Sequence, residues 1–266
     1  MALVANARMY SVTPQAKAAW QALFAWIAET SGVPLVQLDH APPAPLETLW
    51  ERDDLGAAFM CGLPFALTSR QPSLVAAPVL SLPRYGGMPR YCTDLVVRAD
   101  RPFARLSDTF AGRIGWTVEH SQSGYNAVRY HLLRYRRDRP VSLFTEWVGP
   151  LVTPRRVIEA VLEGEIDVGP LDSYVHELLR RHEPATAARL RVLESTVMTP
   201  IPPVVAASTV ASGTIERLRL AFLSSGTEPA MATVLDTLAI MRFAPIDVAD
   251  YAELALQARA ADARWT

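Results

Sequence analysis

The sequence predicts an α/β protein of two lobes, in which the second lobe is inserted into the first. Short apolar runs of strand length alternate with amphipathic helical patterns along the chain, as in sheets covered by helices. The pattern restarts after Arg98 and changes again at a proline-rich segment, residues 200–203. We therefore expect crossings near residues 97 and 201. Lobe 1 would hold residues 1–96 and 202–266, and lobe 2 residues 97–201.

Capping residues mark the expected helix starts. Thr13 and Thr153 each precede a proline, which suits an N-cap followed by the first helical position. Gly32 and Gly164 suit the ends of these two helices. Further helices are expected at residues 46–50, 124–136 and 173–179, and over most of 212–264. Strands are expected at residues 3–9, 35–38, 55–60, 74–80, 94–98, 113–118, 143–148, 166–168, 190–193 and 204–207.

The composition excludes several classes of function. The 266 residues carry 26 basic and 27 acidic side chains, a formal net charge of -1, so no global field attracts nucleic acid. The basic run at residues 134–139 fits a solvated helix end. The two cysteines, Cys61 and Cys92, form no CxxC pair, which predicts free thiols and no zinc site. We expect no metal and no cofactor.

Membrane and export signals are also missing from the given sequence. No stretch approaches the roughly 20 apolar residues of a membrane span, so the protein is expected not to be membrane-embedded. Residues 1–10 lack a basic region followed by a long apolar run, which is not the pattern of a signal peptide. We expect a cytosolic protein, or a periplasmic one whose leader is absent.

The strongest candidate site is the segment of residues 119–125, E-H-S-Q-S-G-Y, between an expected strand and an expected helix. Small hydroxyl residues and a glycine expose the first N–H groups of a helix, and the helix dipole adds positive potential, so an anion can bind there without a lysine or arginine. Ordinary capping by Ser123 explains the same residues, and the two interpretations stay open on spacing alone.

Other candidates also lie at strand ends or helix starts. Cys61 ends a buried strand, a position where ligands bind in open α/β sheets, although for Cys61 taken alone the pattern favours a buried inert thiol. Asp172 can pair with a cationic group of a ligand or cap the following helix. The sequence has no G-x-S-x-G elbow, Walker loop, dinucleotide-binding glycine pattern or HExxH motif, and His120 next to Ser121 is a poor acid–base pair because neighbours on a strand face opposite sides.

Five segments together resemble the phosphate/phosphonate-binding family of type II periplasmic binding proteins. In chain order they are C-G-L-P-F at residues 61–65, Y-C-T-D-L-V-V-R-A-D at 91–100, S-Q-S-G-Y-N-A at 121–127, V-L-E-G-E-I-D-V at 161–168 and L-D-S at 171–173. Their order and spacing agree with the family from about residue 3 to residue 207. No single motif is specific, but five in order are.

The resemblance implies a type II periplasmic-binding-protein fold that holds a small anion between two lobes and closes over it through two hinge crossings. It further implies an ABC-type uptake role, with a permease as a partner, and a monomer. The implied oxyanion grip is formed by Ser121, Ser123, Gly124 and Tyr125. The remaining implied ligand-binding residues are Tyr10, Cys61, Tyr91, Thr93, Thr153 and Asp172.

Two departures from the family pattern bear on the ligand. The family usually carries glycine, serine and histidine before the helix that starts at Pro154, whereas this chain has Leu151, Val152 and Thr153. After Tyr10 many members have an acidic residue, and this chain has Ser11. A less polar pocket would suit a carboxylate, a sulfonate or a larger organic ion. A cytosolic ligand sensor and a small-molecule enzyme on the same fold remain the alternatives.

Overall fold

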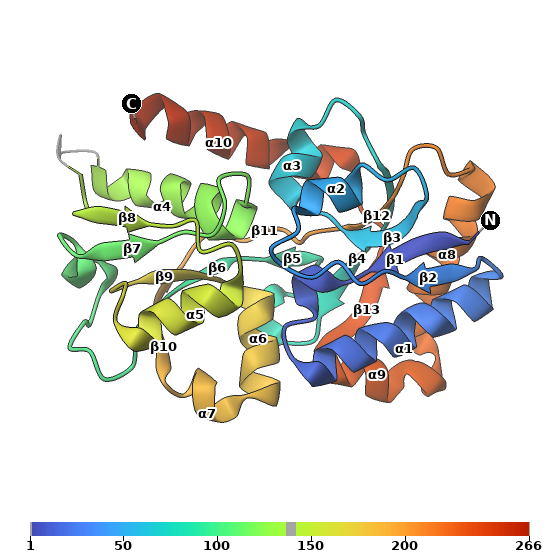
Figure 1. Ribbon diagram of the computed structural model, residues 1–266, viewed down its shortest axis with the longest axis horizontal. Helices are drawn as coiled ribbons and strands as arrows, with labels where there is room; N and C mark the ends of the chain where they lie inside the picture. The colour runs from blue at the N-terminus through green and yellow to red at the C-terminus, as the bar shows by residue number, and fades with distance from the viewer. Residues whose placement is uncertain (1, 137–141, 266) are drawn as a thin grey trace. The chain divides into compact units, whose positions relative to one another are not determined.

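The computed structural model describes residues 2–136 and 142–265, in two compact units (Figure 1). Unit 1 comprises Met1–Arg90 and Pro200–Tyr251, and unit 2 comprises Tyr91–Thr199 and Ala252–Thr266. The chain passes between units in two short paired strands, β5 (Arg90–Tyr91) and β11 (Thr199–Pro200), and again after Tyr251. The expected α/β class is confirmed.

Unit 1 is built on a six-stranded mixed sheet in the order β13-β4-β12-β3-β1-β2. Strands β1 and β2, and β1 and β3, pair in parallel, whereas β12 pairs antiparallel with both β3 and β4, and β13 pairs antiparallel with β4. The strands are β1 (Leu3–Asn6), β2 (Leu35–Gln37), β3 (Leu55–Phe59), β4 (Ser73–Leu80), β12 (Val204–Ala206) and β13 (Ile240–Ala244). The helices of this unit are α1 (Pro14–Ser31), α2 (Leu46–Trp50), α3 (Gly62–Leu67), α8 (Ser212–Ser224) and α9 (Ala232–Thr237).

Helix α1 follows the capping chemistry that the sequence predicts. The Thr13 hydroxyl accepts a hydrogen bond from the Ala16 N–H at 3.1 Å, and Gly32 closes the helix with a φ of 63°. The buried face of α1 carries Trp20, whose ring meets Phe59 edge-on with 5.0 Å between the centroids. This aromatic packing anchors α1 to the central strand β3.

Unit 2 holds a three-stranded antiparallel sheet in the order β10-β6-β9 and a parallel pair, β7 and β8. A parallel bridge between Ile114 and Val168 brings β7 beside the start of β9. The strands are β6 (Thr93–Arg98), β7 (Arg113–Gly115), β8 (Glu146–Val148), β9 (Gly169–Asp172) and β10 (Leu190–Ser195). The helices are α4 (Ala127–Arg136), α5 (Pro154–Glu163), α6 (Ser173–His182), α7 (Pro184–Ala187) and α10 (Ala252–Trp265).

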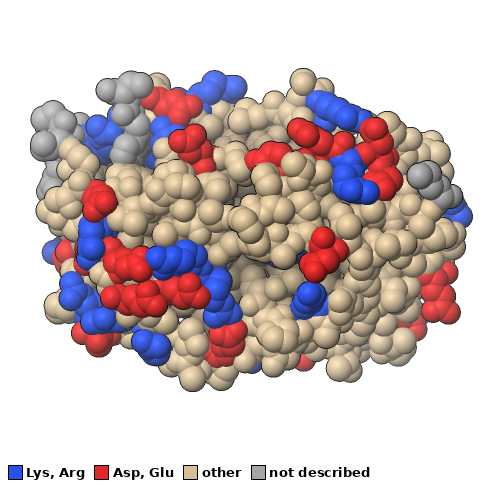
Figure 2. Space-filling view, in the orientation of Figure 1, with Lys and Arg blue, Asp and Glu red and all other residues tan. Residues whose placement is uncertain are grey.

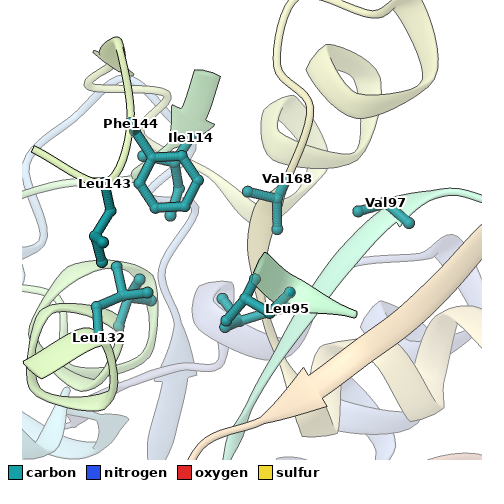
Figure 3. Close-up of a cluster of buried hydrophobic side chains, with 9 residues drawn as sticks. Leu95, Val97, Ile114, Leu132, Leu143, Phe144 and Val168 are labelled. Atoms are coloured by element: carbon teal, nitrogen blue, oxygen red, sulfur yellow. The ribbon is translucent and has the colours of Figure 1, made fainter. Parts of the chain in front are cut away.

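The core of unit 2 contains a cluster of apolar side chains between its strands and α4 (Figure 3). Leu95, Ile114 and Val168 reach it from the strands, and Leu132 reaches it from α4; each of these four side chains is 0 % exposed. Phe144, just before β8, lies against the same cluster. This packing holds α4, and therefore the segment from which it starts, against the sheet.

The C-terminal helix differs from the sequence expectation. The sequence placed residues 202–266 in one lobe, with crossings near residues 97 and 201, whereas the units divide after Arg90 and Thr199 and α10 belongs to unit 2. Helix α10 packs on α4 (Figure 1), and the Arg129 guanidinium lies 2.8 Å from the Asp262 carboxylate. Periodicity predicts a helix here but does not identify the surface that its apolar face will cover.

Several element boundaries also differ. The first strand ends at Asn6 and a short 3-10 helix, Arg8–Tyr10, follows. Strand β7 ends at Gly115, β8 begins at Glu146, and the strand expected at residues 166–168 is instead β9, Gly169–Asp172. Helix α3 and strand β13 were missed because short apolar runs fit helix and strand equally well. The basic run at 134–139 is described only as far as Arg136.

The charged side chains show no single-sign area on the face in Figure 2, where acidic and basic groups are mixed. Of the helices described, none is long and apolar enough to span a bilayer. The mixed charges on this face favour recognition by local geometry rather than by a field of one sign.

A buried histidine on α4 predicts a pH dependence of stability. His131 Nε2 lies 2.9 Å from Glu194 Oε2 on β10 and 2.7 Å from the Arg134 guanidinium, and the Tyr135 hydroxyl donates to Glu194 Oε1 at 2.5 Å. Burial lowers the pKa of His131 below its ordinary 6.5, and Arg134 lowers it further, while Glu194 opposes the shift. The folded protein therefore favours neutral His131.

We expect the unfolding free energy to fall as the pH drops below 6.5, because the unfolded chain then binds a proton that folded His131 resists. Burial raises the pKa of Glu194, but the hydrogen bonds from its partners outweigh burial, so the pKa is lowered from 4.5. The stability that ionised Glu194 contributes is therefore lost only at a more acidic pH than the contribution of His131. Denaturant melts between pH 7.5 and 5 should show a shallower pH slope for His131→Gln than for the wild type. Equal slopes would assign the effect to other groups.

Candidate functional site

The predicted anion-binding segment forms a helix start in unit 2, but Ser121 rather than Ser123 is its N-cap. The Ser121 hydroxyl accepts from the Gly124 N–H at 2.9 Å, and the Asn126 N–H donates to the Ser121 carbonyl at 3.0 Å. Residues Gln122–Asn126 form one π-helical turn that continues directly into α4. The wider turn explains why the cap lies two residues earlier than expected.

Gly124 is packed against a residue that the sequence analysis did not select. A Cβ atom at Gly124 would lie 1.9 Å from Thr117 Oγ1 and 2.8 Å from Thr117 Cβ, and the Thr117 N–H donates to the Gly124 carbonyl at 3.2 Å. Only glycine allows the helix start to approach Thr117 this closely. The Thr117 side chain is 6 % exposed, and among the described residues its hydroxyl has no hydrogen-bond partner.

An unpartnered buried hydroxyl is costly, which makes Thr117 Oγ1 a candidate ligand contact at this helix start. The sequence offered one signal for it: Thr117 is a polar residue two positions after β7, at the carboxyl end of a parallel strand, where α/β proteins place ligands.

Thr93 contacts the start of α4, and Asp172, its neighbour across the sheet, lies at the start of α6; their roles as ligand contacts remain predictions. The Thr93 hydroxyl donates to the Ser123 carbonyl at 2.8 Å, and Thr93 on β6 pairs with Asp172 on β9. Asp172 caps α6 by accepting from the Tyr174 N–H at 2.8 Å and the Val175 N–H at 3.2 Å. The capping interpretation of Asp172 is therefore confirmed.

Thr153 belongs to the same neighbourhood through backbone contacts. The N–H groups of Leu151 and Val152 donate to the carbonyls of Trp116 and Thr117 at 2.9 and 3.2 Å. Val152 takes a positive φ of 63°, and Thr153 then caps α5 by accepting from the Arg156 N–H at 3.2 Å. Three capped helix starts, those of α4, α5 and α6, thus gather around Thr117 and Thr93, where their dipoles favour an anion.

Tyr125 differs from the other members of the predicted grip because its ring belongs to an aromatic cluster. Its centroid lies 5.3 Å from that of Trp116 and 6.1 Å from that of Trp147, and the Arg129 guanidinium lies 5.0 Å above it. The ring therefore packs against Trp116, which follows β7, and Trp147 of β8, while the backbone of Tyr125 forms part of the π-helical turn.

Tyr10, Cys61 and Tyr91 are all buried, at 0, 6 and 1 % exposure. In unit 1 the Tyr10 ring meets Phe59 edge-on at 4.9 Å and its carbonyl accepts from Trp20 Nε1 at 3.3 Å. Cys61 occupies the N-cap position of α3 and Tyr91 lies in β5. Cys61 and Cys92 are free thiols, as expected. The ligand-contact roles of Tyr10, Cys61 and Tyr91 remain predictions.

The arrangement in unit 2 supplies hydroxyls and helix N–H groups, which can donate to an oxyanion, and one carboxylate, Asp172, which can only accept. In the described part of the chain no three His, Cys, Asp or Glu side chains gather into a metal site. The geometry therefore defines an anion-binding α/β protein whose recognition relies on hydrogen bonds and helix dipoles.

Comparison with solved structures shows the fold. The binding-protein component of an ABC phosphonate transporter from Pseudomonas aeruginosa matches at 20 % identity with a TM-score of 0.81, covering 99 % of this chain and 89 % of that one. PhnD1 from Prochlorococcus marinus, solved in complex with methylphosphonate, matches at 16 % identity with a TM-score of 0.80, covering 98 % of both chains. A Xanthomonas citri protein bound to ATP matches at 19 % identity and 0.66, covering 100 and 99 %.

Residues 10–251 match the family described as the ABC transporter, phosphonate, periplasmic substrate-binding protein. The chain belongs to this family, and its fold is that of type II periplasmic binding proteins. No curated protein sequence matches it. The family resemblance drawn from the five segments is thereby confirmed.

Proposed function

We propose that this protein captures a phosphonate-type oxyanion at the start of α4 and delivers it to an ABC permease without chemical turnover. The observation that carries the proposal is the Thr117 hydroxyl, which is buried without a described partner against Gly124 of the π-helical turn. Such a hydroxyl is satisfied if a ligand oxygen occupies the space next to it.

The proposed grip consists of Ser121, Ser123, Gly124 and Thr117. Ser121 Oγ already accepts from Gly124, so its O–H can donate elsewhere. The Thr93 hydroxyl donates to the Ser123 carbonyl, which fixes the Ser123–Gly124 peptide plane and with it the direction of the Gly124 N–H. Family membership supports the transport role, and the absence of a nucleophile with an activating base from the sequence motifs supports binding without turnover.

The neighbouring carboxylate favours an oxyanion that retains a proton. Asp172 on β9 lies opposite Thr93 on the neighbouring strand β6, and Thr93 contacts the start of α4. An ionised carboxylate only accepts hydrogen bonds and repels a fully ionised ligand. A phosphonate or phosphate carries a P–OH proton near neutral pH and can donate it, whereas sulfate cannot. We infer a preference for phosphonates and phosphate over sulfate.

Calorimetric titration with methylphosphonate, inorganic phosphate, sulfate and acetate tests this proposal. We expect methylphosphonate or phosphate to bind at least about tenfold more tightly than sulfate, a difference of about 1.4 kcal/mol. At equal concentration, the anion that binds more tightly should raise the melting temperature more, because the stabilisation grows as RT ln(1 + c/Kd), where c is the free anion concentration. Equal or tighter binding of sulfate, or a product detected by mass spectrometry, would contradict the proposal.

A further inference from the structure

Three buried amide side chains link the π-helical turn to the C-terminal helix. Asn126 Nδ2 donates to Gln122 Oε1 at 2.7 Å, and Gln122 Nε2 donates to Gln257 Oε1 on α10 at 3.3 Å. Asn126 Nδ2 also lies 3.4 Å from the Leu254 carbonyl of α10. The three side chains are 0, 1 and 7 % exposed for Gln122, Asn126 and Gln257.

These hydrogen bonds hold both ends of the turn that presents Gly124. Gln122 is the first residue of the turn and Asn126 the last, so their side chains close the turn on the side that faces α10. Each amide has one acceptor oxygen and a donor group, and the chain of bonds therefore fixes the orientation of every member. Because the network is buried, the loss of one partner leaves another polar group unsatisfied.

We propose that Gln257 is a positioning residue for the anion site: through Gln122 it holds the Gly124 region of the turn in the geometry that binds the ligand. The inference rests on the proposed function, because it assigns α10 a task at that same site. Gln257 does not touch the ligand; it acts through Gln122 and Asn126.

Attachment of α10 to the unit does not by itself account for this network. Leu254 and Ala261 are each 0 % exposed on the packed face of α10, and Arg129 pairs with Asp262. These contacts already join α10 to unit 2, and apolar side chains could fill the amide positions at lower desolvation cost. The amides add directional hydrogen bonds, which apolar packing cannot supply, at the one turn where backbone orientation determines binding.

The test replaces Gln257 with methionine, which keeps the length of the side chain and removes the acceptor for Gln122. Titration with methylphosphonate and inorganic phosphate should show affinity reduced about tenfold, the effect of losing one well-placed hydrogen bond to an anion. Without any ligand, the ¹⁵N–¹H resonance of Gly124 should shift and its amide should exchange faster with solvent. A role confined to attaching α10 would leave the Gly124 amide unchanged.

Asp262→Asn is the matched control, because it weakens a surface contact between the same two helices and should alter neither readout. The double variant Gln257→Met/Gln122→Met tests whether Gln257 acts through Gln122. If it does, the double variant should lose little more affinity than Gln122→Met alone. A folded Gln257→Met protein with an unchanged Gly124 amide and unchanged affinity would overturn the proposal, as would fully additive losses.

Gln257→Ala covers the case in which the methionine variant does not fold. The smaller alanine side chain leaves space that water can enter to satisfy Gln122. If the wild type binds none of the probes, the proposed function fails, but the Gly124 resonance and exchange still decide whether Gln257 positions the turn. The two failures are therefore distinguishable.

Discussion

Replacing Gly124 with alanine is expected to abolish anion binding. The new methyl group would lie 1.9 Å from Thr117 Oγ1 and 2.8 Å from both Thr117 Cβ and Cγ2, so the helix start and the strand end must move apart. Overpacking of this kind costs about 1–3 kcal/mol of folding stability. Because binding needs the turn and Thr117 at their present separation, affinity for methylphosphonate should fall about a hundredfold or more.

Gly213→Ala is a matched control, since Gly213 lies in α8 with no atom within 4 Å of the added Cβ. It should leave affinity unchanged and raise stability by about 0.5–1 kcal/mol. All three close atoms at Gly124 belong to the Thr117 side chain, so adding Thr117→Gly to Gly124→Ala should restore much of the lost stability but not the affinity. Denaturant melts and calorimetry separate the two effects. A Gly124→Ala protein with normal affinity would remove this turn from the site.

Replacing both Ser121 and Ser123 with alanine should weaken anion binding about a hundredfold or more. Each hydrogen bond to a charged group contributes about 1.5–3 kcal/mol. The two serines differ in their capping role. The Ser121 hydroxyl accepts from the Gly124 N–H and caps the turn, whereas Ser123 makes no capping hydrogen bond in the described structure. Ser121→Ala should therefore also cost about 1 kcal/mol of stability, and Ser123→Ala should reduce affinity with little loss of stability.

Asp108→Ala serves as the control for loss of a cap. Asp108 accepts from the N–H groups of Ala104 and Arg105 at 2.8 and 2.9 Å elsewhere in unit 2. Asp108 is the N3 residue of a capping box, so its replacement should lower the unfolding free energy without changing affinity. Should the serine double variant melt earlier but bind as before, the segment is only a helix start, and the oxyanion grip must be sought elsewhere.

The candidate site combines Gly124, which the spacing of the sequence identifies, with Thr117, which it does not. A glycine after two serines, between a strand and a helix, indicates a capped anion site from local chemistry alone. Thr117 enters only because β7 and the π-helical turn pack together, so that its hydroxyl meets Gly124. A contact of this kind depends on the separation of two elements and has no local sequence signal.

By itself, the sequence determined the α/β class, the capped starts of α1 and α5, and the family to which the chain belongs. These follow from local rules: Thr13 and Thr153 satisfy helix N–H groups within three residues, and the five motifs keep their order along the chain. Only the tertiary structure decided that α10 packs in unit 2, that Ser121 rather than Ser123 is the cap, and that Gln257 reaches Gln122. An amphipathic pattern states that a face will be buried, whereas its partner depends on the competition among all surfaces of the folded chain.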